Sequence, residues 1–138
     1  MDFEKAKEAL AGLTGQAEEL IRDPGKLEAL LQSLEEKVKD LPVAGDAISR
    51  VPLMISMIRS YITKEYTAVS PKVIATLVAA IVYLFKGKDL IPDNIPVLGY
   101  ADDLAVFAAA FLIDEPELSA YAQWRAEKEP VEETPELA

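Results

Sequence analysis

The sequence contains neither cysteine nor histidine, and these two absences exclude whole classes of chemistry. Without a thiol there is no disulfide and no cysteine nucleophile, and without an imidazole there is no serine–histidine or cysteine–histidine dyad. Ordinary zinc sites use the same two residue types and are excluded as well. Any metal site in this chain would therefore be built from oxygen ligands, which suit magnesium, calcium or manganese.

Basic residues are scarce, since 14 lysines and arginines stand against 24 aspartates and glutamates. The resulting net charge of −10 argues against nucleic acid as a partner, because phosphate backbones are bound by lysine and arginine. The cations are concentrated in residues 50–88, which hold 6 basic side chains and 1 acidic side chain between two acidic flanks. This basic middle either pairs with the acidic flanks or is solvated, or it forms a cationic belt at an anionic membrane surface.

Alternation of apolar and polar residues is also absent, as is an Asn-Gly hairpin signal, so no sheet is predicted. Apolar residues recur at helical spacing instead, and 138 residues of which 51% are hydrophobic can form one real core. We predict an all-α fold, a compact bundle of five to six helices. No basic leader followed by an apolar run opens the chain, so no signal peptide is expected.

Breaker residues divide the chain into three regions. In residues 1–42 we predict two amphipathic helices that pack on the core, the first with a break near Thr14 and the second starting at Asp23-Pro24. Residues 46–127 form the main helical domain, in which Pro52 either starts or kinks a helix over 47–66. Residues 128–138 are acidic and lack apolar periodicity, which predicts a disordered tail.

Two apolar helices, 71–86 and 102–113, are predicted to form the central pair. Gly87 is expected to end the first as a left-handed cap, and Asp102 and Asp103 are expected in or just before the first turn of the second. The uncharged run from Val73 to Phe85 is shorter than the roughly 20 residues that cross a bilayer. It therefore favours a core helix, with a re-entrant or interfacial role as the alternative. A last helix is expected from Asp114 to about Arg125.

The most unusual stretch lies between the two apolar helices, where carboxylates and prolines stand among apolar residues. It reads Asp89-Leu90-Ile91-Pro92-Asp93-Asn94-Ile95-Pro96-Val97-Leu98-Gly99-Tyr100-Ala101-Asp102-Asp103. Because Pro92 and Pro96 interrupt regular structure, we predict a crossover loop that joins an antiparallel helical pair.

This stretch resembles the signature of the YkvA-like family of unknown function, and Ser70-Pro71 with the apolar helix fits the same pattern. The resemblance covers about residues 60–114 and rests on ten motif positions, namely Asp89, Leu90, Ile91, Pro92, Asp93, Pro96, Gly99, Tyr100, Asp102 and Asp103. The family usually has Ser-Pro-hydrophobic where this chain has Lys86-Gly87-Lys88, and an aromatic or apolar residue at the place of Asn94. The resemblance implies a mostly bacterial, helical and often membrane-associated domain whose biochemical activity is not established.

The acids of the motif admit three interpretations. Each can have a local duty, with Asp89 and Asp93 closing turns and Asp102 and Asp103 capping the following helix. Alternatively the four converge on a divalent cation, magnesium or calcium, which would relieve their mutual repulsion. Paired carboxylates could also perform acid–base catalysis, but the sequence supplies no evident nucleophile or phosphate-binding loop, so catalysis is the least favoured.

We therefore expect a non-enzymatic interaction or membrane-associated module, with a divalent-cation site as the alternative function. The expected partner is another protein or a membrane surface, and nucleic acid is not expected. We expect the chain in the cytoplasm or peripherally at the membrane. One discriminating quantity is the separation of the four carboxylates, because groups more than about 8 Å apart cannot share one ion.

Overall fold

The computed structural model describes residues 3–40, 49–90 and 97–128, and within these ranges every regular element is a helix and no strand occurs. Side chains are described for residues 3–39, 49–85 and 105–128. The helices are α1 (Phe3–Gly12), α2 (Thr14–Ile21), α3 (Pro24–Asp40), α5 (Val51–Ile62), α6 (Pro71–Leu90), α7 (Val97–Ile113) and α8 (Glu115–Lys128). The predicted all-α bundle is confirmed, and the number of helices exceeds the expectation because the first one is divided.

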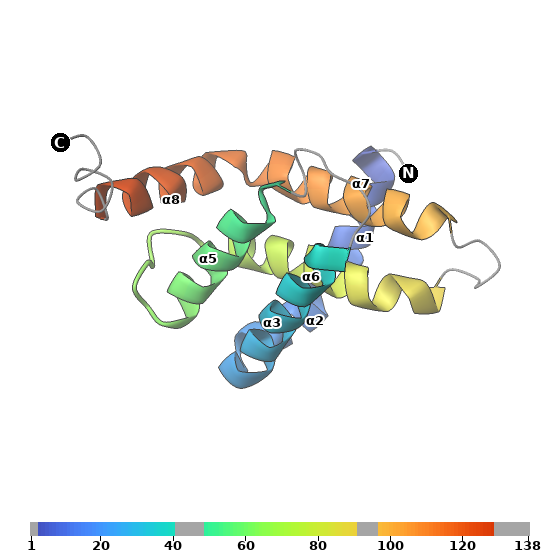
Figure 1. The fold of residues 1–138 in the computed structure, drawn as a ribbon, viewed down its shortest axis with the longest axis horizontal. Coiled ribbons are helices and arrows are strands. Elements are labelled where there is room, and N and C mark those ends of the chain that lie inside the picture. The colour runs from blue at the N-terminus through green and yellow to red at the C-terminus, as the bar shows by residue number, and fades with distance from the viewer. Residues whose placement is uncertain (1–2, 41–48, 91–96, 129–138) are drawn as a thin grey trace.

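The centre of the fold is the hairpin of α6 and α7, which run side by side in opposite directions (Figure 1). Helix α6 is buried almost all the way round between Ile74 and Leu84, which is why its apolar residues show no single face. The chain then continues from α7 into α8 nearly in line, so that these two helices form one long edge of the molecule (Figure 1).

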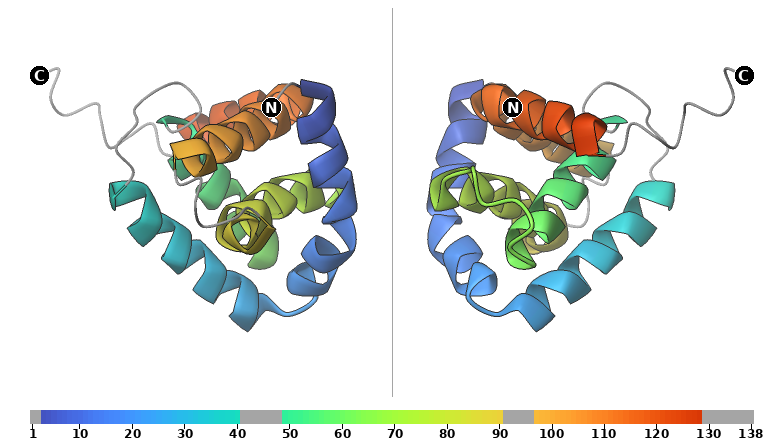
Figure 2. Two further views of the ribbon diagram at one scale, coloured as in Figure 1. Left: turned by 90° about the vertical axis from the view of Figure 1, so that its right-hand side faces the viewer. Right: turned by 90° about the vertical axis from the view of Figure 1, so that its left-hand side faces the viewer.

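The remaining helices surround α6. Helix α1 packs against α7 and α6, α2 packs against α6, and α3 contacts α2 and α5. Seen along the long axis, α1 and α2 form one side of a triangular frame and α3 the other, with α7 and α8 closing it (Figure 2). Residues from all these helices join one apolar cluster. Helix α1 contributes Ala6 and Leu10 to it, and α2 contributes Ala17.

Two expected breaks occur near the predicted positions. Between α1 and α2 the backbone departs from helical geometry at Leu13, and the Thr14 hydroxyl donates a hydrogen bond to the Leu10 carbonyl at 3.1 Å. Such a bond competes with the regular helical pattern. Pro52 lies in the first turn of α5, so it starts this helix rather than kinking it.

Two predicted helix ends are wrong. Helix α6 continues through Gly87 to Leu90, so Gly87 is not its cap. A helical glycine costs only about 1 kcal/mol relative to alanine, so Gly87 does not interrupt the helix. Helix α7 begins at Val97, which places Asp102 and Asp103 in its second turn rather than its first.

Candidate functional site

For three of the four predicted metal ligands the structure describes the backbone, which lies at one end of the α6–α7 hairpin. Asp89 belongs to the last turn of α6, and Asp102 and Asp103 belong to the second turn of α7. The fourth, Asp93, lies outside the described residues. The side chains of the other three are also outside the described part, so the cation site stays a prediction. Among the side chains that the structure does describe, no three acids gather closely enough to hold a metal ion.

The remaining motif positions divide in the same way. Leu90 is the last residue of α6, and Gly99 and Tyr100 lie in the first turn of α7. Ile91, Pro92 and Pro96 fall outside the described residues. The crossover that the prolines predict therefore spans at most residues 91–96, because both flanking helices extend further into the motif than the sequence suggested.

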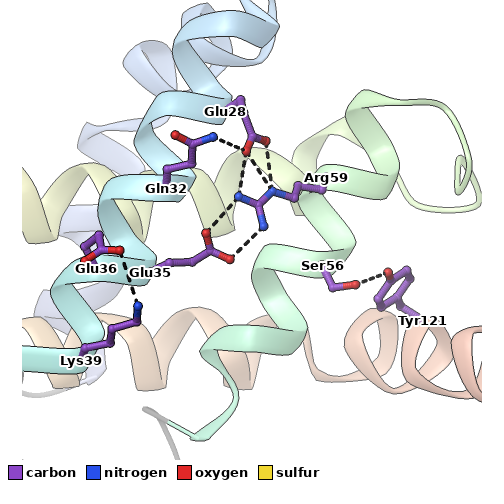
Figure 3. A network of polar contacts seen from close by, with 8 residues as sticks. All are labelled: Glu28, Gln32, Glu35, Glu36, Lys39, Ser56, Arg59 and Tyr121. Atoms are coloured by element: carbon purple, nitrogen blue, oxygen red, sulfur yellow. Dashed lines mark hydrogen bonds and ion pairs between the residues drawn. The ribbon is translucent and has the colours of Figure 1, made fainter.

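Two of the six basic residues in the middle of the chain are paired with acids of the flanks. The first of them is Arg59 on α5. Its guanidinium lies between Glu28 and Glu35 of α3 (Figure 3). Arg59 Nη2 donates to a Glu28 oxygen at 2.7 Å, and Nη1 donates to a Glu35 oxygen at 2.8 Å. The two glutamates are seven residues apart, which places them on one face of α3 two turns from each other. We call these three residues the arginine clamp.

The arginine clamp changes the titration of its members in a consistent direction. The hydrogen bonds from Arg59 hold the pKa of the Glu28 and Glu35 carboxyls below their usual range. The same bonds raise the pKa of the Arg59 guanidinium. All three side chains keep contact with solvent, so water weakens the attraction. The clamp connects α3 to α5. It also pairs Arg59 internally, so this cation is less available for a cationic belt at an anionic membrane surface.

Arg50 is engaged in the same manner at the other acidic flank. It forms an ion pair with Glu115 at the start of α8, and its guanidinium carbon lies 5.7 Å from the centre of the Phe111 ring. These contacts connect the start of α5 with the α7–α8 edge. Both arginines of residues 50–88 are thus paired with acids from the flanks, which favours internal pairing over a cationic belt.

Hydroxyl and aromatic groups attach α8 to the rest of the molecule. The Tyr121 hydroxyl lies 2.5 Å from Ser56 Oγ and 2.9 Å from Ser60 Oγ, both on α5. The Tyr121 ring also meets Tyr66 edge-on at 5.0 Å and stacks on Trp124 at 5.5 Å. Each serine hydroxyl is hydrogen-bonded to a phenol rather than to a base, so this arrangement serves packing and gives neither serine an activating partner.

A cleft of about 760 Å³ opens beside the arginine clamp, between α3 and α5 and near the end of α8. Its walls mix apolar groups such as Val38 and Ile55 with charged groups that include Glu35, Arg59 and Arg125. The clamp neutralises part of this charge internally. The lining therefore shows neither a convergent set of ligands nor a general acid–base pair among the described residues.

The corner between α7 and α8 has an unusual distribution of exposure. The side chains of Leu112 and Ile113 are 66% and 42% exposed, whereas the following Asp114 is only 3% exposed. Burial, with a contribution from Glu117, raises the pKa of the Asp114 carboxyl to about 7. The sequence predicts only that the last helix starts at Asp114. The available signal was its position directly after an uncharged run, where a carboxylate is poorly solvated.

Within the residues that the structure describes, none of the helices combines the length and the apolar character that crossing a bilayer requires. Helix α6 has 20 residues, but its sequence includes Lys72, Lys86, Lys88 and Asp89.

Comparison with known proteins places the hairpin in a family. The model of the family described as "Protein of unknown function (DUF1232)" matches residues 73–109, which cover most of α6 and α7. The chain is also 35% identical over 78 residues to the "Uncharacterized membrane protein YkvA" of Bacillus subtilis (strain 168), covering 56% of this chain and 74% of that protein. No solved structure matches the chain. The resemblance seen in the motif is confirmed, and the chain belongs to the DUF1232, or YkvA-like, family.

Proposed function

We propose that this protein is a non-enzymatic helical module that binds peripherally to a membrane surface through the corner between α7 and α8. The observation that carries the proposal is the exposure of Leu112 and Ile113 at the end of α7, whose last ten residues are uncharged. The Bacillus subtilis relative is called a membrane protein, which supports the same proposal.

The geometry of the α7–α8 edge suits contact with a flat surface. Ala108 and Leu112 are exposed one turn apart on α7, and Ile113 adds to the apolar end of this helix. Full burial of one leucine or isoleucine side chain contributes about 1.5–3 kcal/mol. Because both side chains are already partly covered, the gain is smaller, and the expected contact is weak and reversible.

The charge distribution indicates which kind of membrane is suited. Arg50 and Arg59 are bound to glutamates, and the chain carries a net charge of −10. Attraction to anionic lipid therefore contributes little, and the apolar contact has to provide the binding. We expect binding to neutral phosphatidylcholine vesicles that changes little between low and high salt, in contrast to binding through a polybasic patch.

Vesicle flotation tests the proposal. The wild-type chain should float with phosphatidylcholine vesicles, and the double variant Leu112→Gln, Ile113→Gln should lose most of this binding because its apolar contact area is removed. Ala29→Gln provides a matched control, since Ala29 is an exposed residue of α3. Helix α3 lies apart from the α7–α8 edge (Figure 1). Absence of wild-type flotation over the range from acidic to alkaline pH would reject membrane binding.

A divalent-cation site at the motif remains the second candidate function. It is supported by the hairpin, which brings the backbone of Asp89 and that of Asp102 and Asp103 to the same end of the molecule. Calorimetric titration with magnesium, calcium and manganese should then give a heat of binding that Asp93→Ala abolishes. No heat with any of the three ions, together with an unchanged melting temperature in Asp93→Ala, would eliminate this site.

A further inference from the structure

The α7–α8 corner places a buried acid directly beside the exposed apolar residues. The Oδ2 atom of Asp114 is buried and has no hydrogen-bond partner. The backbone fixes this residue between the helices, because its N–H donates to the Ala110 carbonyl and its carbonyl accepts from the Leu118 N–H, each at 3.0 Å. This oxygen therefore gains contact with water only if the corner itself rearranges.

We infer that protonation of Asp114 controls the membrane contact made by Leu112 and Ile113, an inference that rests on the proposed function. A neutral carboxylic acid tolerates apolar surroundings, whereas an ionised one without hydrogen-bond donors loses its hydration. Laying Leu112 and Ile113 against lipid removes further water from the corner. The contact is thus compatible with the neutral acid and opposed by the ionised one.

The charged groups on the elements around the corner do not place a paired cation on the Asp114 carboxyl, so its neutral form is favoured by burial and by Glu117. On α8, Glu117 adds negative charge, and Glu115 holds Arg50, the cation that precedes α5. Lys72 is exposed at the start of α6, the helix that packs along α7. Helix α1, which also packs on α7, carries exposed charges of both signs, namely Glu4, Lys5, Lys7 and Glu8.

The burial of Asp114 brings its titration into the range in which cells operate, because it raises the pKa of this carboxyl to about 7. Proton binding and membrane binding then strengthen each other, since two ligands that favour the same state must do so reciprocally. Acidification should promote attachment to the membrane, and attachment should raise the pKa of Asp114 further.

Flotation at two pH values tests this coupling with phosphatidylcholine vesicles, whose headgroups do not titrate in this range. About 1.5 pH units below and above 7, the protonated fraction of Asp114 differs about thirtyfold. Wild-type binding should accordingly be at least several-fold stronger at the lower pH. Asp114→Asn, which is neutral throughout, should bind equally at both pH values and about as well as the wild type does at the lower one.

The outcomes separate the inference from the proposed function. Wild-type flotation that is equal at both pH values, or a pH dependence that persists in Asp114→Asn, would overturn the proton control while membrane binding stands. No flotation at either pH would reject both. Carbon NMR titration of Asp114 in the unmodified chain gives an independent measurement, because adding phosphatidylcholine bicelles should raise its pKa. An unchanged pKa on bicelles that bind the protein would contradict the coupling.

Discussion

At the scale of single residues, the arginine clamp shows what one side chain can supply when its shape fits two partners. Arg59 presents a planar fork of donors that meets a carboxylate on either side, and lysine has no such fork. The clamp connects residues that are 24 and 31 positions apart in the sequence. It therefore fixes the relative position of α3 and α5 in a way that local helix propensity cannot.

Arg59→Lys should destabilise the fold by about 1 kcal/mol, because the positive charge remains but the paired hydrogen bonds to Glu28 and Glu35 are lost. Urea denaturation of both proteins at neutral pH measures the difference. Lys39→Ala is a suitable control, since its ion pair with Glu36 is 3.5 Å long and both side chains are mostly exposed. Equal stability of Arg59→Lys and wild type would show that the clamp contributes charge alone.

Asp114 should make the fold less stable as pH rises, which is opposite to the effect of the clamp glutamates. Its pKa in the folded state is about 7, above the ordinary value of 3.8, so its contribution is fully present below about pH 4 and is lost as pH rises through 7. The clamp carboxyls have lowered pKa values, so they stabilise above pH 4.5 and lose their effect as pH falls below it.

Thermal melting between about pH 5.5 and about pH 8.5 isolates the Asp114 contribution, because the clamp glutamates stay ionised throughout this window. The wild-type melting temperature should fall towards the alkaline end. Asp114→Asn should remove most of this slope, whereas Glu115→Gln, which breaks the neighbouring ion pair, should keep it. A flat wild-type profile would contradict a neutral, buried Asp114.

At the scale of elements, helix α6 tests which signal decides where a helix ends. Because Gly87 lies inside α6, Gly87→Ala should stabilise the protein by about 0.5–1 kcal/mol, since alanine loses less chain entropy on folding. Gly15→Ala in α2 is the control for the same chemistry, as no atom lies within 4 Å of an added Cβ. Urea denaturation measures both variants. Destabilisation by Gly87→Ala but not by Gly15→Ala would instead support a left-handed cap at Gly87.

Most elements could be predicted from the sequence, because apolar spacing and breakers such as Pro24 and Pro71 act locally. The predicted end of α6 was wrong because two local signals, Gly87 and Pro92, competed there. The predicted start of α7 was wrong because this helix begins at Val97, before Asp102 and Asp103. The arginine clamp could not be predicted, since the spacing of Glu28 and Glu35 is visible but their partner is far away in sequence. The burial of Asp114 likewise depends on helices that only the folded chain brings together.

The candidate site could be predicted only in outline. The motif placed the acids between the two apolar helices, whereas the structure puts the backbone of Asp89 in α6 and that of Asp102 in α7. The family was predicted from the same motif and is confirmed. The exposed corner at Leu112 and Ile113 was not predicted, because an apolar run gives no indication of which of its residues remains uncovered. Exposure is a property of the assembled helices rather than of any one of them.

At the scale of the whole molecule, the N-terminal helices share the core with the family hairpin. Removal of residues 1–22 would uncover the parts of α6 and α7 that α1 and α2 contact, and it would delete buried Ala6, Leu10 and Ala17. We expect a loss of several kcal/mol, a large share of the roughly 5–15 kcal/mol that stabilises a typical domain. Urea denaturation of the shortened chain measures it, and unchanged stability would show that these helices are dispensable.

The aromatic group that attaches α8 to α5 also gives the protein an optical reporter of its own. Trp124 is the only tryptophan in the chain, and its ring lies 4.9 Å from that of Tyr66 and 5.5 Å from that of Tyr121. Its fluorescence therefore arises from one known position at the contact between these elements. Detachment of α8, by heat, by denaturant or on a lipid surface, can be followed in real time without a label.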